Sequence, residues 1–235
     1  MHKAIKAEAL QFSDAERIES YKRYFKCIPG AYGYGDTFVG IKSPELRTLA
    51  KKYRGITLAQ LESLIQDKIH EIRLLALYIL VLKFQNKKAT TNEKKQLVSS
   101  YLKNLDFVNN WDLVDSSAHY VLGAWEFQHP SETLFQLATH SNMWYNRVAM
   151  IATFYHIKQK AFELPLRIAE LLIENKNDII HKAVGWMLRE IAMRNQPLAL
   201  NFIREHYTAM SRTTLRYAIE KFDVSLRHDC LKGTF

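Results

Sequence analysis

The sequence predicts an all-α fold, a right-handed α-solenoid in which pairs of helices repeat along a single domain over residues 1–235. Glycine and proline are scarce, with 8 and 5 residues in 235, less than half of the roughly 12% that average usage gives. Few turns exclude a β-sandwich or barrel, whose chains turn about every 10 residues. Apolar residues instead recur at helical spacing almost from end to end.

Local signals place the helices in order. Asp14 is an N-cap for a helix to Lys26, Ser43 is an N-cap followed by Pro44 at the first position of a helix to about Tyr53, and Thr57 caps a helix to about Ile65. Helical spacing predicts the remaining helices over 68–84, 92–102, 109–122, 131–139, 142–159, 164–174, 178–194, 197–206 and 211–222.

One segment departs from this pattern. Residues 28–41 read IPGAYGYGDTFVGI and hold four of the eight glycines. Aromatic residues alternate around Gly35 and Asp36, which predicts a small hairpin or an ordered loop. It is not a phosphate-binding loop, because no Gly-Lys-Ser/Thr follows. A connector and a wedge that contacts a ligand both remain compatible with this composition.

Charge and cysteine usage bound the partners and the compartment. The net charge of +9 favours a polyanion such as nucleic acid, although a basic protein without such a partner has the same composition. Cys27 and Cys230 form neither a metal-binding spacing nor a disulfide framework. No cluster of ligand residues for a metal or an organic cofactor appears elsewhere in the sequence, so we expect neither. The N-terminus lacks the apolar stretch of a secretory signal, and the longest apolar run, 74–82, is about half of a bilayer span. We expect a cytoplasmic protein without a membrane partner.

A repeat connects the predicted helices. Its anchor residues are spaced by 39, 35, 35 and 34 positions, and each is followed by two mainly apolar residues: Arg73, Asp112, Arg147, Lys182 and Arg216. This period lies near the short end of the HEAT and armadillo range, and the Trp-Leu-Gly-Tyr pattern of tetratricopeptide repeats is missing. The repeat therefore predicts two-helix units of HEAT or armadillo type.

The basic anchors predict a binding surface. Residues that recur once per repeat on equivalent helices should form a basic line on the concave face of a solenoid, a shape and charge that suit duplex DNA. The residues expected to contact DNA are Arg73, Arg147, Lys182, Arg189 and Arg216. Lys182, Trp186 and Arg189 also share one helix face. Basic residues that are solvated, or that cap main-chain carbonyls, would produce the same pattern.

Asp115 interrupts the repeat. Three residues after each anchor, the other repeats place small or apolar residues: Ala76, Met150, Gly185 and Ile219. Burying an unpaired carboxylate costs several kcal/mol, so Asp115 is either paired, placed at a helix N-terminus or open to a cleft. Trp111 lies one turn away, and Arg147 and Trp186 hold nearly equivalent positions in the next repeats. Two indoles beside a carboxylate suit a cationic ligand group.

Four stretches carry a resemblance to a known family: FVGIKSPELR (38–47), WDLVDS (111–116), MWYNRVA (143–149) and HKAVGWMLRE (181–190). The chain resembles the AlkD-like DNA alkylation repair proteins, the HEAT-like-repeat DNA glycosylases, over nearly its whole length. The resemblance implies that Asp115 is the catalytic carboxylate, that Trp111 and Trp186 are the cleft tryptophans and that Arg147 contacts a phosphate. It also implies that the damaged base is not flipped into a pocket.

Two functions fit these residues. The first is a monofunctional DNA glycosylase that releases purines alkylated at N3 or N7, which are cationic and leave through an oxocarbenium-like state that Asp115 would stabilise. The second is a non-catalytic binder of branched or distorted DNA. Asn110, where the glycosylase has a tryptophan, and the long Gly-rich segment resemble that branch of the family. A protein scaffold explains the charged residues less well. We expect a monomer with double-stranded DNA as its partner.

Overall fold

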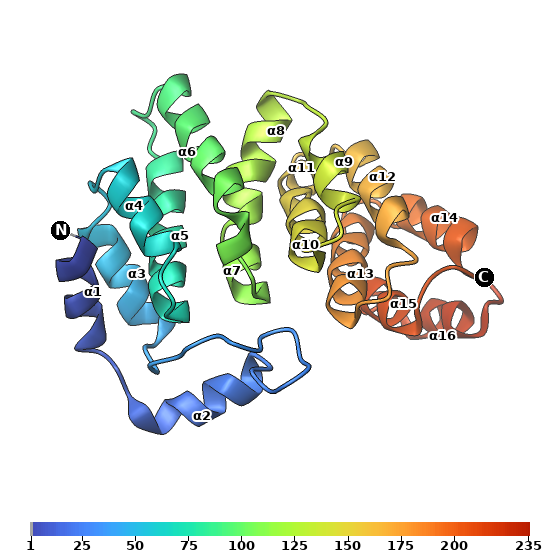
Figure 1. The fold of residues 1–235 in the computed structure, drawn as a ribbon. Coiled ribbons are helices and arrows are strands. Elements are labelled where there is room, and N and C mark those ends of the chain that lie inside the picture. Colours follow the sequence, from blue (N-terminus) through green and yellow to red (C-terminus); the bar gives the residue numbers. More distant parts are fainter. Residues whose placement is uncertain (1) are drawn as a thin grey trace. The chain divides into compact units, whose positions relative to one another are not determined.

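The computed structural model describes residues 2–235, and its regular elements are helices, which confirms the predicted all-α class of packed helical repeats (Figure 1). Within these residues, β-structure is limited to one parallel bridge between Thr37 and Ile69. The chain divides into two compact units, unit 1 over residues 1–121 and unit 2 over residues 122–235. That the whole chain acts as one domain stays a prediction. None of the helices in residues 2–235 is long and apolar enough to cross a membrane.

Unit 1 is organised around one long helix. Its helices are α1 (His2–Leu10), α2 (Ala15–Tyr24), α3 (Ser43–Lys52), α4 (Leu58–Ile65), α5 (His70–Phe84), α6 (Thr91–Lys103), the 3-10 helix η1 (Leu105–Phe107) and α7 (Trp111–Asp115). α5 packs against α3, α4, α6 and α7. It is apolar on every side, and Ile72, Leu75 and Ile79 have no exposed surface, as expected for a helix enclosed by others.

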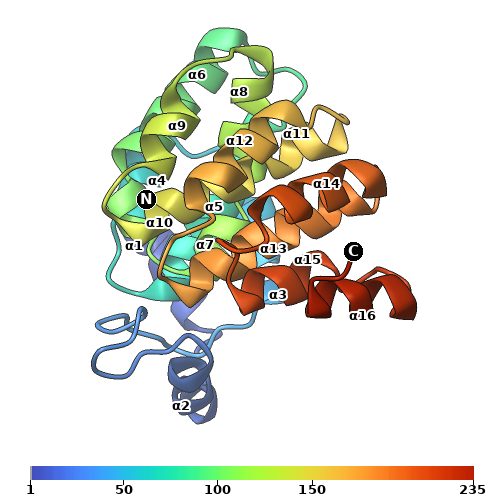
Figure 2. The same ribbon diagram turned by 90° about the vertical axis from the view of Figure 1, so that its right-hand side faces the viewer.

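The Gly-rich segment forms an ordered loop and not a hairpin. α2 and this loop lie near one end of α5 in both ribbon views (Figures 1 and 2), where the main-chain NH of His70 donates to Thr37 O at 2.9 Å. Gly40 has a φ of +82°, and a Cβ there would lie 2.1 Å from Asp14 O. The glycine is thus needed both for its left-handed backbone and for the close approach to α2.

Unit 2 contains nine α-helices among its described residues. They are α8 (Ala124–Gln128), α9 (Thr133–Ala138), α10 (Met143–Ala152), α11 (Phe154–Lys158), α12 (Glu163–Leu172), α13 (Asp178–Ala192), α14 (Gln196–His206), α15 (Arg212–Ala218) and α16 (Val224–Lys232). A π-helical turn, η2 (His119–Gly123), connects α7 to α8 across the boundary between the units. α13 is the central helix, because it packs against α10, α12, α14 and α15.

Helix boundaries follow the predicted caps at two of three positions. The predicted N-cap at Ser43 is wrong, because Ser43 is already the first residue of α3 and Lys42 is the N-cap, without a side-chain cap hydrogen bond. The predicted caps at Asp14 and Thr57 are confirmed, since each side chain accepts a hydrogen bond from its helix's first turn. The helix predicted over 142–159 is divided at Thr153, whose buried hydroxyl donates to Met150 O at 2.7 Å. α1 and α16 were not expected. α16 does carry recognisable end signals, an Asp223 N-cap and a left-handed Gly233.

A glycine in α13 permits its close contact with α15. A Cβ at Gly185 would lie 2.6 Å from the main-chain oxygen of Thr214 and 2.5 Å from Tyr217 Cβ. We expect Gly185→Ala to lower the free energy of unfolding by about 1–3 kcal/mol in urea denaturation, because separating the helices outweighs the gain in helix propensity. Gly55→Ala is the matched control, with no atom within 4 Å of its Cβ. Equal stability of both variants would contradict this packing.

Candidate functional site

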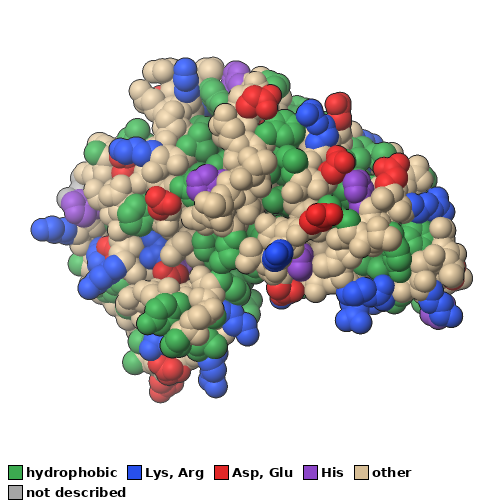
Figure 3. Space-filling model, turned by 45° about the vertical axis from the view of Figure 1, so that its right-hand side comes forward, with side chains coloured by type: hydrophobic (Ala, Val, Ile, Leu, Met, Phe, Trp, Pro, Cys, Tyr) green, Lys and Arg blue, Asp and Glu red, His purple; other side chains and the backbone are tan. Residues whose placement is uncertain are grey.

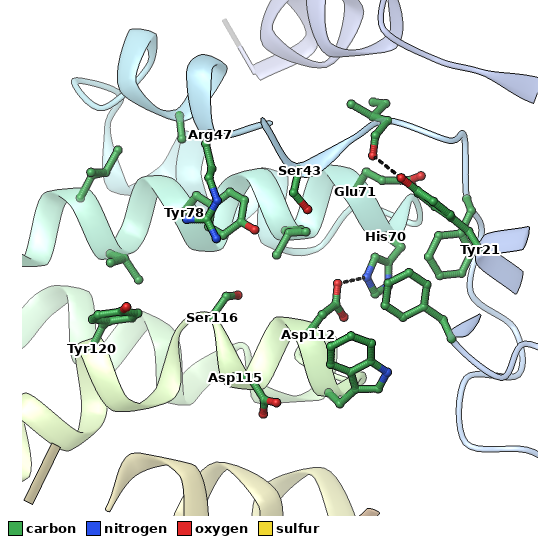
Figure 4. Close-up of a pocket in the computed structure, with 18 of the residues that line it drawn as sticks. Tyr21, Ser43, Arg47, His70, Glu71, Tyr78, Asp112, Asp115, Ser116 and Tyr120 are labelled. Atoms are coloured by element: carbon green, nitrogen blue, oxygen red, sulfur yellow. Dashed lines mark hydrogen bonds and ion pairs between the residues drawn. The ribbon is translucent and has the colours of Figure 1, made fainter. Parts of the chain in front are cut away.

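A cavity of about 770 Å³ lies within unit 1 (Figure 4). Aromatic side chains form much of its wall: Tyr21, Tyr24, Phe25, Phe38, Tyr78, Trp111 and Tyr120. Its charged and titratable lining residues are Arg47, Lys51, His70, Glu71, Asp112, Asp115 and His119. Trp111 and Asp115, which the sequence places one turn apart, therefore line the same cavity. Asp115 points from the side of α7 opposite Asp112 and Ser116.

The start of α7 is fixed by Asn110. This residue is fully buried, and its Oδ1 accepts a hydrogen bond from the main-chain NH of Trp111 at 2.9 Å. Its Nδ2 donates to Phe25 O at 3.4 Å. Asn110 is thus an N-cap that also ties α7 to the end of α2.

Trp111 belongs to an aromatic cluster. Phe25 stacks on Trp111 with ring centroids 5.3 Å apart, and Tyr24 meets Trp111 edge-on at the same separation. Phe25 also stacks on Phe38 at 5.0 Å. Tyr24 remains 64% exposed, so it extends the aromatic wall to the surface of unit 1. These contacts hold the partly exposed Trp111 indole in one orientation.

Asp115 differs from its counterparts in burial as well as in chemistry. Ala76, Met150 and Ile219 have no exposed surface and Gly185 is buried, which confirms that this position of the repeat packs inward. Asp115 is half-buried at the cavity. A carboxylate that is partly shielded from water interacts more strongly with a nearby positive charge than an exposed one does.

A buried histidine joins three segments of unit 1. His70, at the first position of α5, is 1% exposed. Its Nδ1 lies 2.9 Å from Asp36 Oδ2 in the Gly-rich loop, and its Nε2 lies 2.8 Å from Asp112 Oδ2 in α7. Because both ring nitrogens face carboxylate oxygens, both must donate, and the ring is an imidazolium. We call Asp36, His70 and Asp112 the histidine clamp.

Electrostatics support the charged form of the clamp. Burial by itself lowers the pKa of His70, but Asp112 and Asp36 outweigh it and raise the pKa to about 9. Burial likewise acts to raise the pKa of Asp36, yet His70 and Arg73 hold that pKa below its usual value. Arg73 Nη2 lies 2.6 Å from Asp36 Oδ1, so two cations face two anions in this buried group.

The clamp is not a metal site. Its imidazole stands between the two carboxylates, and both ring nitrogens are already engaged. Elsewhere in the described part of the chain, no group of three or more His, Cys, Asp or Glu side chains could hold a metal ion.

The same end of α5 also holds the Gly-rich loop. Glu71 is 2% exposed, and its Oε1 accepts hydrogen bonds from the main-chain NH groups of Val39 at 3.0 Å and Gly40 at 2.8 Å. Arg73 adds its ion pair with Asp36. Side chains from the first turn of α5 therefore hold the loop at Asp36, Val39 and Gly40.

The basic anchors differ from the expected exposed line. Arg73 is 4% exposed and its Nη1 donates to Asp67 O at 3.1 Å, while Arg147 is 5% exposed and its Nη1 donates to Ile179 O at 2.6 Å. For these two the expectation of an exposed basic surface is wrong, because the guanidinium groups bind main-chain carbonyls of their own units. Arg73 and Arg147 instead fit the alternative interpretation of the repeat, in which the basic residues cap main-chain carbonyls.

Other predicted residues of unit 2 lie nearer the solvent. Trp186 is partly exposed and its Nε1 donates to Glu190 Oε1 at 3.2 Å. Lys182 pairs with Asp178 at 2.7 Å, Arg189 pairs with Glu220, and Arg216 is exposed. On the face shown in Figure 3, lysine and arginine side chains are interspersed with acidic ones.

Sequence reasoning missed Asp36, His70 and Tyr24 as parts of this region. Asp36 and His70 are 34 positions apart, so no local spacing relates them. One signal was present: the anchor position is basic in every repeat except that of Asp112. The structure explains the exception, since Asp112 contacts an imidazolium where Arg73 and Arg147 contact carbonyls.

The sequence model of the DNA alkylation repair enzyme family matches residues 5–222. The chain belongs to this family. A solved structure described as a predicted DNA alkylation repair enzyme from Enterococcus faecalis is similar, with a TM-score of 0.70 and 20% identity over 90% of this chain and 97% of that chain. At that identity the likeness concerns the fold alone. No curated protein matches the chain. Membership of the DNA alkylation repair family assigns the chain a role in DNA repair.

The histidine clamp predicts how stability depends on pH. The pKa of His70 is raised in the folded protein from 6.5 to about 9, so its stabilisation is complete below pH 6.5 and is lost as pH rises through about 9. The loss amounts to at most about 3 kcal/mol. Urea denaturation between pH 6 and 10 measures it. His70→Gln should remove most of this pH dependence, and an unchanged dependence would contradict the charged clamp.

Proposed function

We propose that this family member binds double-stranded DNA and acts as a monofunctional DNA glycosylase on purines alkylated at N3 or N7, without flipping the base into a pocket. The observation that carries the proposal is Asp115. It is a half-buried carboxylate at an aromatic-lined cavity, in a position that four other repeats fill with buried small or apolar residues.

The chemistry follows from the charge of the substrate. An alkylated purine with a positive ring is a good leaving group, and cleavage of its glycosidic bond leaves an oxocarbenium-like sugar. Asp115 would stabilise that positive charge and orient the attacking water. Trp111, held by Phe25 and Tyr24, would pack against the deoxyribose, and Trp186 of unit 2 is also proposed to contact the DNA. The proposed reaction uses no metal or organic cofactor.

Phosphate contacts are proposed for the basic residues that the structure leaves near solvent. In unit 2 these are Lys182, Arg189 and Arg216. In unit 1, Arg47 and Lys51 are exposed, lie one turn apart on α3 and line the same cavity as Trp111. The buried Arg73 and Arg147 are proposed to support these surfaces from within.

A second candidate, a non-catalytic binder of branched or distorted DNA, is favoured by the Gly-rich loop. Tyr34 is 67% exposed on this loop, and Tyr24 is 64% exposed beside it. Exposed aromatic rings on an ordered backbone suit stacking on unpaired bases. Asn110 is a buried N-cap and does not line the cavity, so it offers no aromatic surface there.

Asp115→Asn separates the two candidates. We expect excision of methylated purines to slow roughly 10²–10³-fold with little change in DNA affinity, because the amide keeps the shape and loses the charge that stabilises the transition state. Release of free base from alkylated DNA is measured, with Asp106→Asn as the control, since Asp106 is exposed in unit 1 and does not line the cavity.

Two results would contradict the enzymatic role of Asp115. A lower melting temperature with normal excision per folded molecule would make it structural. A wild type that excises nothing, but that binds junction DNA more tightly than linear duplex, would support the second candidate.

Charge reversal tests the phosphate contacts. Lys182→Glu and Arg216→Glu should each flatten the slope of log affinity against log salt by about 0.9, because each removes one phosphate contact. Lys87→Glu and Lys88→Glu are charge-matched controls in the exposed turn after α5. If all four variants weaken binding equally, the effect is one of net charge and not of a DNA-binding surface.

A further inference from the structure

We propose that His70 is a positioning residue, and that its bond to Asp112 holds α7, and with it Trp111 and Asp115, in the orientation that forms the aromatic wall of the cavity. The effect on base excision rests on the proposed function, whereas the effect on the position of Trp111 does not. Asp112 directly follows Trp111 and stands three residues before Asp115.

α7 takes its orientation from contacts within unit 1. It is the first part of a helical stretch that continues through Ala118 into η2, so its free end is the start, at Trp111 and Asp112. Its side-chain link to α5 is the bond from His70 Nε2 to Asp112 Oδ2. The other oxygen of that carboxylate, Oδ1, is buried without a hydrogen-bond partner in residues 2–235. The tie between Asp112 and α5 therefore rests on one ring nitrogen.

The imidazole also supports Trp111 through the aromatic cluster. The His70 ring stacks on Phe38 with centroids 4.6 Å apart and lies 4.9 Å from Phe25. Phe25 in turn stacks on Trp111. His70 is thus linked to α7 in two ways: through its hydrogen bond to Asp112, and through Phe25, which stacks on Trp111. Both links end at the part of α7 that lines the cavity.

The charged groups around His70 bear on which carboxylate, Asp36 or Asp112, would lose its hydrogen bond to a neutral ring. The groups facing His70 are Asp36 from the loop and Asp112 from α7; Arg73 pairs with Asp36, and the Glu71 carboxylate is turned to the main chain of the loop. Near Asp36, Cys27 is a neutral thiol whose pKa burial raises. A neutral imidazole can donate from only one nitrogen, so one carboxylate must be released.

The carboxylate that can be released to water is that of Asp112, because it lines the cavity and Asp36 does not. Asp36 keeps two other partners, Arg73 Nη2 at 2.6 Å and Asn109 Nδ2 at 3.4 Å. Asp112 has no second side-chain partner at Oδ1. Loss of the His70 proton should therefore break the link between Asp112 and α5 and loosen the packing of Trp111, while Asn110 still ties α7 to α2 and the Gly-rich loop stays attached. The clamp thus acts as a proton-dependent latch on the start of α7.

The test uses the free, full-length protein. Nitrogen chemical shifts of the His70 ring should show both nitrogens protonated at pH 7, with a midpoint at about 9. Tryptophan fluorescence should change with the same midpoint, and Trp111→Phe should abolish the change. His70→Gln and Asp112→Asn should both show the high-pH fluorescence already at pH 7, and Asp36→Asn should not.

His156→Gln is the matched control. His156 is also buried, in unit 2, and burial lowers its pKa. Its loss should leave the Trp111 signal unchanged. Asp112→Asn preserves shape, so it tests the latch even if His70→Gln does not fold. The proposal is overturned if the His70 ring is neutral at pH 7, or if Asp112→Asn retains the wild-type fluorescence and its pH midpoint.

Excision gives an independent readout. If the protein is a glycosylase, Asp112→Asn should slow base release roughly 10–10²-fold, as expected for a misplaced catalytic group, with a smaller effect on DNA affinity. Normal excision by this variant would overturn the positioning role. A wild type without excision would overturn the proposed function instead, while the ring shifts and fluorescence would still decide the latch.

Discussion

A positive charge buried in a protein must be paired with anions. In unit 1, His70 carries such a buried charge. The imidazolium draws one carboxylate from the Gly-rich loop and one from α7, and Arg73 balances the remaining negative charge. Three segments that are distant in sequence are thereby fixed at one end of α5. The aromatic cluster of Phe25, Phe38 and Trp111 forms around the same ring, so apolar packing and charge pairing act at one place.

The repeat shows how one helix position can serve different purposes. Arg73 and Arg147 use the anchor position to bind main-chain carbonyls, Arg73 in the loop before α5 and Arg147 in the first turn of α13. Asp112 uses it to bind an imidazolium, and Lys182 uses it for an ion pair nearer the solvent. Equivalent positions in the repeat place the backbone of these residues alike. The segments around each position differ, and they determine which group the side chain contacts.

The sequence was sufficient for features that depend on local patterns. Helical periodicity, the caps at Asp14 and Thr57 and the inward-facing column around Asp115 all follow from spacing, and spacing places Trp111 next to Asp115. It was insufficient where the outcome depends on contacts between distant segments. Burial of Arg73 and the pairing of His70 with Asp36 are of this kind. The break at Thr153 depends on one hydroxyl that competes with the helix backbone.

Asn110 and the Gly-rich loop are parts of one arrangement. The Asn110 amide donates to Phe25 O, where α2 ends and the loop begins, and a Cβ at Gly33 in the loop would lie 3.2 Å from that amide nitrogen. The space beside Asn110 is therefore already occupied by the loop's own backbone. A larger side chain at position 110 would therefore meet the loop backbone at Gly33. The two departures from the glycosylase pattern that the sequence resemblance implies thus lie at one contact, and replacing Asn110 by a larger residue would require the loop to move.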